Sequence, residues 1–245
     1  MSIPHTDTPY QLILSQGLPD AAAAARLRQD LPAAEWHWIT RLRQPDDRLR
    51  SLTARALVRR LLGRRLGLSP AAIRLGTDPL GKPMLIDGPT ARAPAWQFNM
   101  AHSRDLVLVG IGPGSLGVDV EHRPAAVDNG LWQQVTGHRM PTALAGRTDA
   151  AAQAFCAQWV RREAVLKACG LGLRIEPGTL HLADGDPMDW TCVTGLAAAD
   201  ALQVRLLWDS PAHCAALCLP RTAARPGSWS LHTVELAAWI APSGS

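Results

Sequence analysis

Residues 151–169 read AAQAFCAQWVRREAVLKAC, and the next four residues, 170–173, read GLGL. The long stretch contains no glycine or proline, and a glycine directly after it is typical of a helix C-terminus. We therefore expect one long helix over 151–169. Trp159, Glu163 and Lys167 recur every four residues, so they project from one side of this helix. The column has two interpretations: an ordinary Glu163–Lys167 ion pair on the surface, or a row of side chains that faces a functional site.

A second long helix is expected at 51–66, where apolar residues recur at three- and four-residue spacing and arginines fill the other face. The apolar positions are Leu52, Leu57, Val58, Leu61, Leu62 and Leu66, and the arginines are Arg55, Arg59, Arg60, Arg64 and Arg65. Shorter elements are a strand within 8–18 and helices at 21–29 and near 131–135.

Strand-like runs follow each long helix. After the first, a turn at 77–85 leads into a short strand, and the runs 104–112 and 115–121 are expected to form an antiparallel hairpin. After the second come 178–184, 201–208, 213–220 and 229–239. This repeated order predicts an α+β fold of two similar lobes, each a long helix packed on an antiparallel sheet. We expect an N-terminal lobe at 1–122, a linker at 123–150 and a C-terminal lobe at 151–245.

The composition excludes several classes of protein. With 245 residues, 47% hydrophobic and 19% charged, the chain can bury a sizeable core, which excludes a disordered tail protein. The longest run without a charged residue, 106–118, is shorter than the roughly 20 apolar residues of a membrane span. The first basic residue is Arg26 and no export signal precedes it, so we expect the cytoplasm. A net charge of +4 permits an acidic partner, and no clustered basic run with aromatics indicates nucleic acid.

The cysteines are odd in number and lack paired CxxC spacing, so we expect reduced, mostly buried thiols. They are Cys156, Cys169, Cys192, Cys214 and Cys218. The apolar stretch AHCAALCLP at 212–220 favours a core strand over a metal cluster.

Two carboxylates lie close together in GVDVEH at 117–122. On a strand, Asp119 and Glu121 share one face, where like charges repel unless a cation lies between them. Mg²⁺ takes one or two protein carboxylates and completes its coordination with water and phosphate oxygens. The alternative is an exposed strand end at which His122 and Arg123 are the partners.

Polar residues also gather in FNMAHS at 98–103, where we expect a loop that offers hydrogen-bond donors to an anion. His102 and Ser103 are adjacent and cannot readily aim at one another as base and nucleophile, and no GxSxG is present, so serine-hydrolase chemistry is disfavoured. Of 25 basic residues only Lys82 and Lys167 are lysine. A compact ammonium approaches phosphate as a point charge, so both are candidate phosphate ligands, although chance survival explains the count equally well.

Together and in this order, FNMAHS, GVDVEH and WVRREAVLKACGLGL resemble the larger, pseudo-twofold type of 4′-phosphopantetheinyl transferase, over residues 41–173. The resemblance implies a monomer with its active site in a cleft between the lobes. It implies transfer of 4′-phosphopantetheine from CoA to a serine of an apo acyl or peptidyl carrier protein, with Mg²⁺, or alternatively Mn²⁺, and release of 3′,5′-ADP, as in a holo-[acyl-carrier-protein] synthase. It leaves the pathway open, whether fatty-acid, polyketide, peptide or siderophore and other secondary-metabolite synthesis.

The resemblance also assigns residues. Asp119, Glu121 and Glu163 match the metal-binding acids, and Lys167 matches the lysine that contacts the pyrophosphate. Either Glu163 or a water on the metal would be the base for the serine hydroxyl, and Glu163 is favoured. Arg50 matches the arginine that contacts the 3′-phosphate of CoA. The other residues expected to line the CoA nucleotide pocket are Lys82, Pro83, His102 and Ser103.

The chain departs from the family pattern at two positions: Ala101 replaces a serine, and Arg162 stands where lysine is common. The first removes a hydrogen bond near CoA, and the second changes the geometry of a positive charge. Two other functions stay open: a non-catalytic module that binds CoA or a carrier protein, and a metal-dependent phosphohydrolase that uses the same acids on water.

Overall fold

The structure is a computed structural model, and it describes residues 8–86 and 96–236. The chain forms two compact units: residues up to Gly114 together with those from Pro226 onward, and Ser115–Arg225. The sequence boundaries at 122 and 150 differ from this division, because the last strand belongs to the first unit and residues 123–150 belong to the second. Among the described helices, none is both long and apolar enough to cross a membrane.

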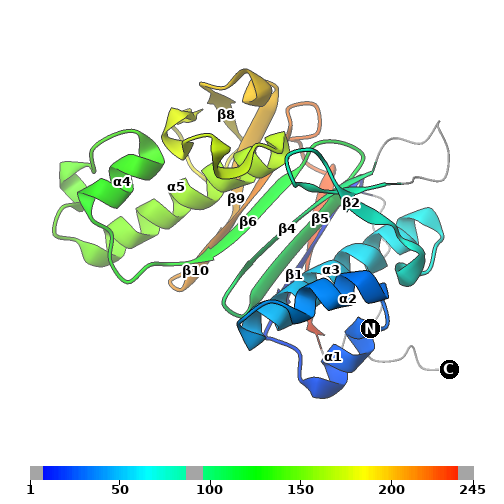
Figure 1. The fold of residues 1–245 in the computed structure, drawn as a ribbon. Helices are drawn as coiled ribbons and strands as arrows, with labels where there is room; N and C mark the ends of the chain where they lie inside the picture. The colour runs from blue at the N-terminus through cyan, green and yellow to red at the C-terminus, as the bar shows by residue number, and fades with distance from the viewer. Residues whose placement is uncertain (1–7, 87–95, 237–245) are drawn as a thin grey trace. The chain divides into compact units, whose positions relative to one another are not determined.

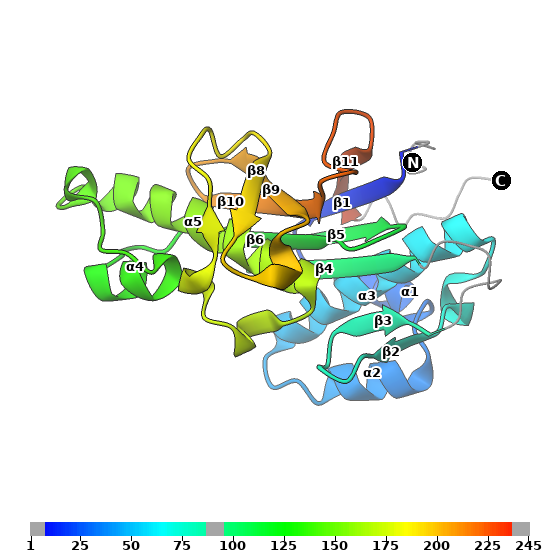
Figure 2. The ribbon, with the colours of Figure 1, turned by 90° about the horizontal axis from the view of Figure 1, so that it is seen from above.

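The first unit has a four-stranded sheet in the order β11-β1-β5-β4. The central strand β1 (Tyr10–Gln16) pairs antiparallel with β5 (Leu106–Gly112) and parallel with β11 (Trp229–Glu235), and β5 also pairs with β4 (Gln97–Ser103). The helices are α1 (Ala21–Arg28), α2 (Ala33–Thr40) and α3 (Pro45–Leu66), with a 3₁₀ turn at Pro70–Ala72. A separate ribbon of β2 (Leu75–Thr77) and β3 (Pro83–Leu85) contacts β4 (Figure 2).

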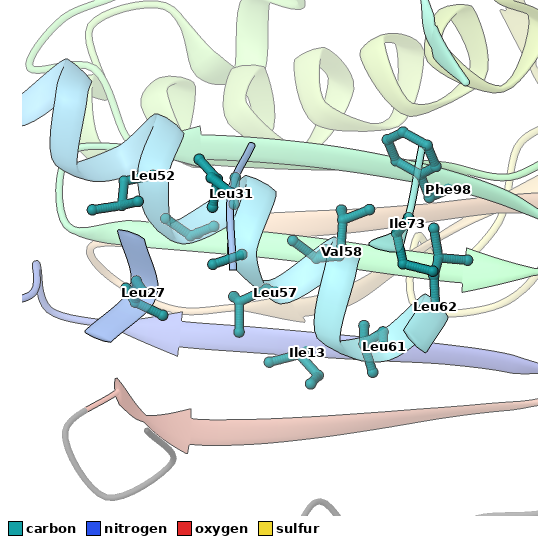
Figure 3. Packing of buried hydrophobic residues seen from close by; sticks show 14 of the residues in the cluster. Ile13, Leu27, Leu31, Leu52, Leu57, Val58, Leu61, Leu62, Ile73 and Phe98 are labelled. Carbon is teal, nitrogen blue, oxygen red and sulfur yellow. The ribbon is translucent and has the colours of Figure 1, made fainter. Parts of the chain in front are cut away.

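Helix α3 covers this sheet with its leucine face (Figure 3). Leu57, Leu61 and Leu62 are buried against strand residues such as Ile13 and Phe98, and burying each such side chain contributes about 1.5–3 kcal/mol. The helix begins six residues before the expected start, with proline in its first turn, and ends at Gly67 in the left-handed conformation.

One arginine of α3 contradicts the expected solvent face. Arg59 is only 2% exposed. Its Nε donates to Oε2 of Glu35 at 2.8 Å, and its Nη1 donates to the carbonyl oxygens of Pro70 and Ile73. The chain folds back over the helix after Gly67, so this guanidinium is covered and satisfied by tertiary partners.

The second unit has a five-stranded sheet in the order β6-β10-β9-β8-β7. Its strands are β6 (Gly117–His122), β7 (His181–Leu182), β8 (Thr191–Thr194), β9 (Leu202–Asp209) and β10 (His213–Pro220). Its helices are α4 (Asn129–Thr136) and α5 (Thr148–Cys169), with 3₁₀ turns at Thr142–Leu144, Gly172–Arg174, Pro177–Thr179 and Ala197–Ala199. Helix α5 runs along β6, β10 and β9 (Figure 1).

The two units share one plan. In each, a helix of 22 residues packs on three antiparallel strands, β1-β5-β4 in the first unit and β6-β10-β9 in the second. The expected α+β class with two similar lobes is therefore confirmed. Helix α5 ends at Gly170 with a positive φ, as the GLGL stretch predicts. The five cysteines are free, and Cys214 and Cys218 lie in the core strand β10 as expected.

Two local expectations are wrong. The runs 104–112 and 115–121 do not form a hairpin, because β5 pairs with β4 and β1 whereas β6 pairs with β10. The FNMAHS stretch is not a loop but most of β4, which turns directly into β5 through Arg104 and Asp105. The tight turn therefore precedes β5 rather than following it.

Candidate active site

The candidate site lies where strand β6 meets helix α5 in the second unit. The two backbones approach very closely at Gly117: a Cβ atom there would lie 1.8 Å from the carbonyl oxygen of Ala164 and 2.6 Å from the amide nitrogen of Ala168. No side chain fits in that space, so glycine is required for this packing. The close approach holds the next residues of β6 against the last turns of α5.

Asp119 follows two residues later and meets Lys167 of α5. The Lys167 Nζ atom donates to Oδ1 of Asp119 at 2.6 Å, and the two side chains are 26% and 4% exposed. Asp119 and Glu121 lie opposite Ala216 and Cys214 of β10, which face the α5 side of the sheet. The alternation of the strand places both carboxylates on one face, as predicted, and this face is the one that the helix covers.

Glu163 is the third carboxylate of this cluster. It is 8% exposed, and its Oε1 atom is buried with no hydrogen-bond partner in residues 8–86 and 96–236. Burial raises the pKa of Glu163, the charge of Lys167 opposes that rise, and the charges of Asp119 and Glu121 add to it. The interpretation as a surface Glu163–Lys167 ion pair is wrong, because Lys167 bonds to Asp119 and Glu163 is buried.

The donor set suits a hard divalent cation. Three carboxylates act on one another here, and a buried carboxylate oxygen of Glu163 lacks a partner within the described ranges. Mg²⁺ needs only one or two protein carboxylates, since water and phosphate oxygens complete its coordination. No group of three or more His, Cys, Asp or Glu side chains that could hold a metal ion occurs in the part of the chain that the structure describes. What suits such a cation here is the chemistry of one or two carboxylates, with water and phosphate oxygens as the other ligands.

Arg162, one of the two departures, points elsewhere. It is 5% exposed and donates to Oε1 of Gln158 and to the carbonyl oxygen of Leu180. Burial, with a contribution from the charge of Arg161, lowers the pKa of Arg162 to about 10. The Arg162 guanidinium thus donates to neutral oxygens, and its bond to Leu180 links α5 to the residue just before β7.

The residues expected to contact CoA lie in the first unit. Arg50, in α3, donates to Oδ1 of Asp47 at 2.6 Å and to the carbonyl oxygen of Arg104 at 2.7 Å. Arg104 has a φ of 50°, the left-handed conformation, in the turn between β4 and β5. Arg50 therefore contacts the turn that directly follows Ser103.

The remaining expected CoA residues lie on strands or turns of this unit. His102 and Ser103 end β4, with the His102 side chain exposed. Pro83 begins β3, and Lys82 lies in the preceding turn, where its amide donates to Oδ1 of Asp78 at 2.8 Å. Ala101 is buried in β4.

Two family models match successive parts of the chain. The model described as 4′-phosphopantetheinyl transferase, N-terminal, matches residues 18–112, and the model of the 4′-phosphopantetheinyl transferase superfamily matches residues 115–216. The chain belongs to the 4′-phosphopantetheinyl transferase superfamily. The second matched range contains the whole carboxylate cluster and Lys167.

The chain is also similar in sequence to several curated members of the superfamily. The 4′-phosphopantetheinyl transferase HetI of Nostoc sp. is 29% identical over 147 residues, which is 58% of this chain and 61% of that protein. A phosphopantetheinyl transferase of Thraustochytrium sp. is 28% identical over 169 residues, 63% of this chain and 58% of that protein. A Bacillus subtilis 4′-phosphopantetheinyl transferase is 25% identical over 163 residues, 66% of this chain and 68% of that protein. The chain thus spans about three fifths of the first two relatives.

The structure brings together four of the residues that the resemblance assigned: Asp119, Glu121, Glu163 and Lys167. Sequence reasoning missed Gly117, whose role comes from a backbone contact. Its signal is weak: a glycine at the start of an otherwise alternating strand, which indicates either a bulge or a close backbone approach.

Proposed function

We propose that this superfamily member transfers 4′-phosphopantetheine from CoA to a serine hydroxyl of an apo acyl or peptidyl carrier protein and releases 3′,5′-ADP. The observation that supports this most directly is the cluster of Asp119, Glu121 and Glu163 with Lys167 in the range that the superfamily model matches. The names of the relatives from three organisms agree with this reaction. We place the chain with the holo-[acyl-carrier-protein] synthase type of transferase.

Asp119, Glu121 and Glu163 would hold Mg²⁺, or Mn²⁺ in its place. When bound, such an ion neutralises the charge that grows on a diphosphate as one of its P–O bonds breaks. Lys167 would supply a further positive charge to the same phosphate oxygens, and its flexible stem allows the ammonium to leave Asp119 for them.

Glu163 would act as the general base. The serine oxygen forms a bond to the phosphorus that carries pantetheine, the bond from that phosphorus to the leaving 3′,5′-ADP oxygen breaks, and the hydroxyl proton passes to Glu163. A base works best when its pKa lies near the working pH. Burial and the two neighbouring carboxylates move the pKa of Glu163 in that direction, whereas the charge of Lys167 and that of a bound cation would oppose the rise.

Recognition of the two substrates stays a prediction from the family. Arg50 would contact the 3′-phosphate of CoA, and Lys82, Pro83, His102 and Ser103 would line the site of its nucleotide. The net charge of +4 would favour the encounter with an acidic carrier protein. We further propose that the protein acts as a monomer in the cytoplasm.

The test is intact-mass analysis of an apo carrier protein incubated with the protein and CoA, with and without Mg²⁺. We expect a metal-dependent mass gain of one phosphopantetheine group. Asp119→Ala and Glu163→Ala should each lower the rate by more than about 100-fold. Asp184→Ala removes an exposed carboxylate of the same unit and should leave the rate unchanged.

Two outcomes would replace this proposal. Binding of CoA without transfer to any of several carrier proteins would favour a binding module. Cleavage of CoA in the absence of a carrier protein would favour a phosphohydrolase. Equal rates for Asp119→Ala and the wild type would remove the metal assignment.

A further inference from the structure

Strand β9 contains a bulge close to its end. Ala216 of β10 lies opposite Leu206, but the next residue, Ala215, lies opposite Trp208, so Leu207 is an extra residue in β9. Side chains alternate between the faces of a strand, and an inserted residue reverses that alternation for everything after it. Without the bulge, Asp209 would point to the face opposite Leu206.

With the bulge, Asp209 points toward helix α5. It lies opposite Cys214 of β10, which in turn lies opposite Glu121 of β6. Directly opposed residues of an antiparallel pair share a face, so these three side chains form a row across three strands. Cys214 belongs to the buried cluster of α5, which identifies the shared face as the one that the helix covers.

The Asp209 carboxylate connects two elements of the candidate site. It accepts a hydrogen bond from Nη2 of Arg123, the residue directly after β6, and its Oδ2 accepts one from Nε2 of Gln153 in α5 at 2.8 Å. The side chains of Arg123 and Asp209 are 14% and 20% exposed, whereas the bond to Gln153 joins two residues at the surface of the unit. The Arg123 amide also donates to the carbonyl oxygen of Ala212 at 2.9 Å.

These bonds attach the second end of the strand segment that contains Asp119 and Glu121 to helix α5. At one end of β6, Gly117 lies against the backbone of α5, and at the other end Asp209 joins the strand to the helix. Between them, Sγ of Cys156 lies 3.6 Å from the carbonyl oxygen of Glu121. The strand segment with Asp119 and Glu121 is therefore held against α5 from both sides.

We propose that Asp209 is a positioning residue of the candidate active site: through Arg123 and Gln153 it sets the spacing between Glu121 on β6 and Glu163 on α5. The proposal rests on the proposed function only in taking these acids as the ligands of the divalent cation. The bulge at Leu207 is the feature that makes it possible, because it turns Asp209 to the helix side. Bulges next to active sites commonly re-aim a side chain in this way.

The experiment measures Mn²⁺ binding by electron paramagnetic resonance, with no substrate present, for the wild type and four variants. Asp209→Ala removes both bonds, whereas Asp209→Asn keeps an oxygen that can accept one of them. Gln153→Leu breaks the bond to α5 without changing any charge. Asp184→Asn is the control, since it removes an exposed carboxylate elsewhere in the unit.

We expect Asp209→Ala to raise the Mn²⁺ dissociation constant about tenfold, the lower range for residues that orient metal ligands. Gln153→Leu should raise it about threefold, Asp209→Asn should lie between wild type and Asp209→Ala, and Asp184→Asn should match the wild type. Two effects in one hydrogen-bonded chain should not add, so Asp209→Ala/Gln153→Leu should resemble Asp209→Ala alone.

Other results would overturn the proposal. Equal losses for Asp209→Ala and Asp209→Asn with no effect of Gln153→Leu would show that only the charge of Asp209 acts. Unchanged amide hydrogen exchange at 121–123 in Gln153→Leu and Asp209→Asn would show that Asp209 does not hold the strand. Both readouts are independent of transfer, so a wild type that binds Mn²⁺ but modifies no carrier protein would refute the proposed function and leave this inference standing.

Discussion

The substitution Gly117→Ala tests the packing on which the candidate site depends. An added Cβ would lie 1.8 Å from the carbonyl oxygen of Ala164, whereas real Cβ atoms essentially never come within 3.0 Å of such an atom. The strand and the helix must therefore separate by about 1.2 Å, because the strand backbone fixes the position of the Cβ and the oxygen belongs to the backbone of the helix. Overpacking of this kind typically costs about 1–3 kcal/mol. We expect the free energy of unfolding to fall by that amount.

The same displacement should reach the carboxylate cluster. Asp119 lies two residues from Gly117, and its Oδ1 atom is 2.6 Å from Nζ of Lys167. A shift of about 1.2 Å weakens such a bond steeply, so the carboxylates would lose their alignment with Glu163.

Urea unfolding measures the loss of stability, and Mn²⁺ binding measures the effect on the cluster. Gly130→Ala, in helix α4, is the control: its Cβ would lie 3.3 Å from Oδ1 of Asp128, a far milder contact, so the free energy of unfolding should change by less than about 1 kcal/mol and Mn²⁺ binding should not change. If Gly117→Ala unfolds at the same urea concentration as the wild type and binds Mn²⁺ equally well, the close approach has no part in holding the site.

Three further predictions concern charged groups. The pKa of Glu163 is raised chiefly by burial, so the native state holds this proton more tightly than the unfolded state does. As the pH rises above about 4.3, the free energy of unfolding of the wild type should therefore fall relative to that of Glu163→Gln. Parallel pH profiles of the two proteins would contradict this. Arg50→Ala should weaken CoA binding about tenfold in calorimetry and leave the affinity for 3′-dephospho-CoA unchanged, and equal affinities for CoA would remove Arg50 from the site. Burial lowers the pKa of Arg161 to about 10, and its Nε donates to the carbonyl oxygen of Ala157. Because the buried charge costs desolvation energy, Arg161→Met should raise the free energy of unfolding by about 1–3 kcal/mol. Arg60→Met should instead lower it, because this change breaks the ion pair with Asp30.

The local sequence pattern was sufficient to predict where the two long helices lie and which residue types the candidate site contains. The spacing of leucines in α3 and the glycine after α5 predict both helices, because helix periodicity and capping involve residues within one or two turns. The alternation of β6 likewise places Asp119 and Glu121 on one face wherever the strand lies.

The local sequence pattern did not predict which strands pair with one another. The hairpin expected from the runs 104–112 and 115–121 is wrong, and so is the loop at 98–103. The hydrogen-bonding edge of a strand is made of backbone groups that are alike in every strand, so the sequence of a strand says little about its neighbour. The neighbour is decided by which elements pack together.

What the sequence determined by itself is therefore the position of α3 and α5 and the residues at which they end, the α+β class, and the types of residue that could hold a cation and phosphate. What only the tertiary structure decided is how they meet: Lys167 bonds to Asp119 rather than to Glu163, and Arg59 is buried. A single extra residue in β9 turns Asp209 toward α5. These outcomes depend on contacts between residues far apart in the chain, and such contacts are set by the packing of whole helices and strands, which no short stretch of sequence encodes.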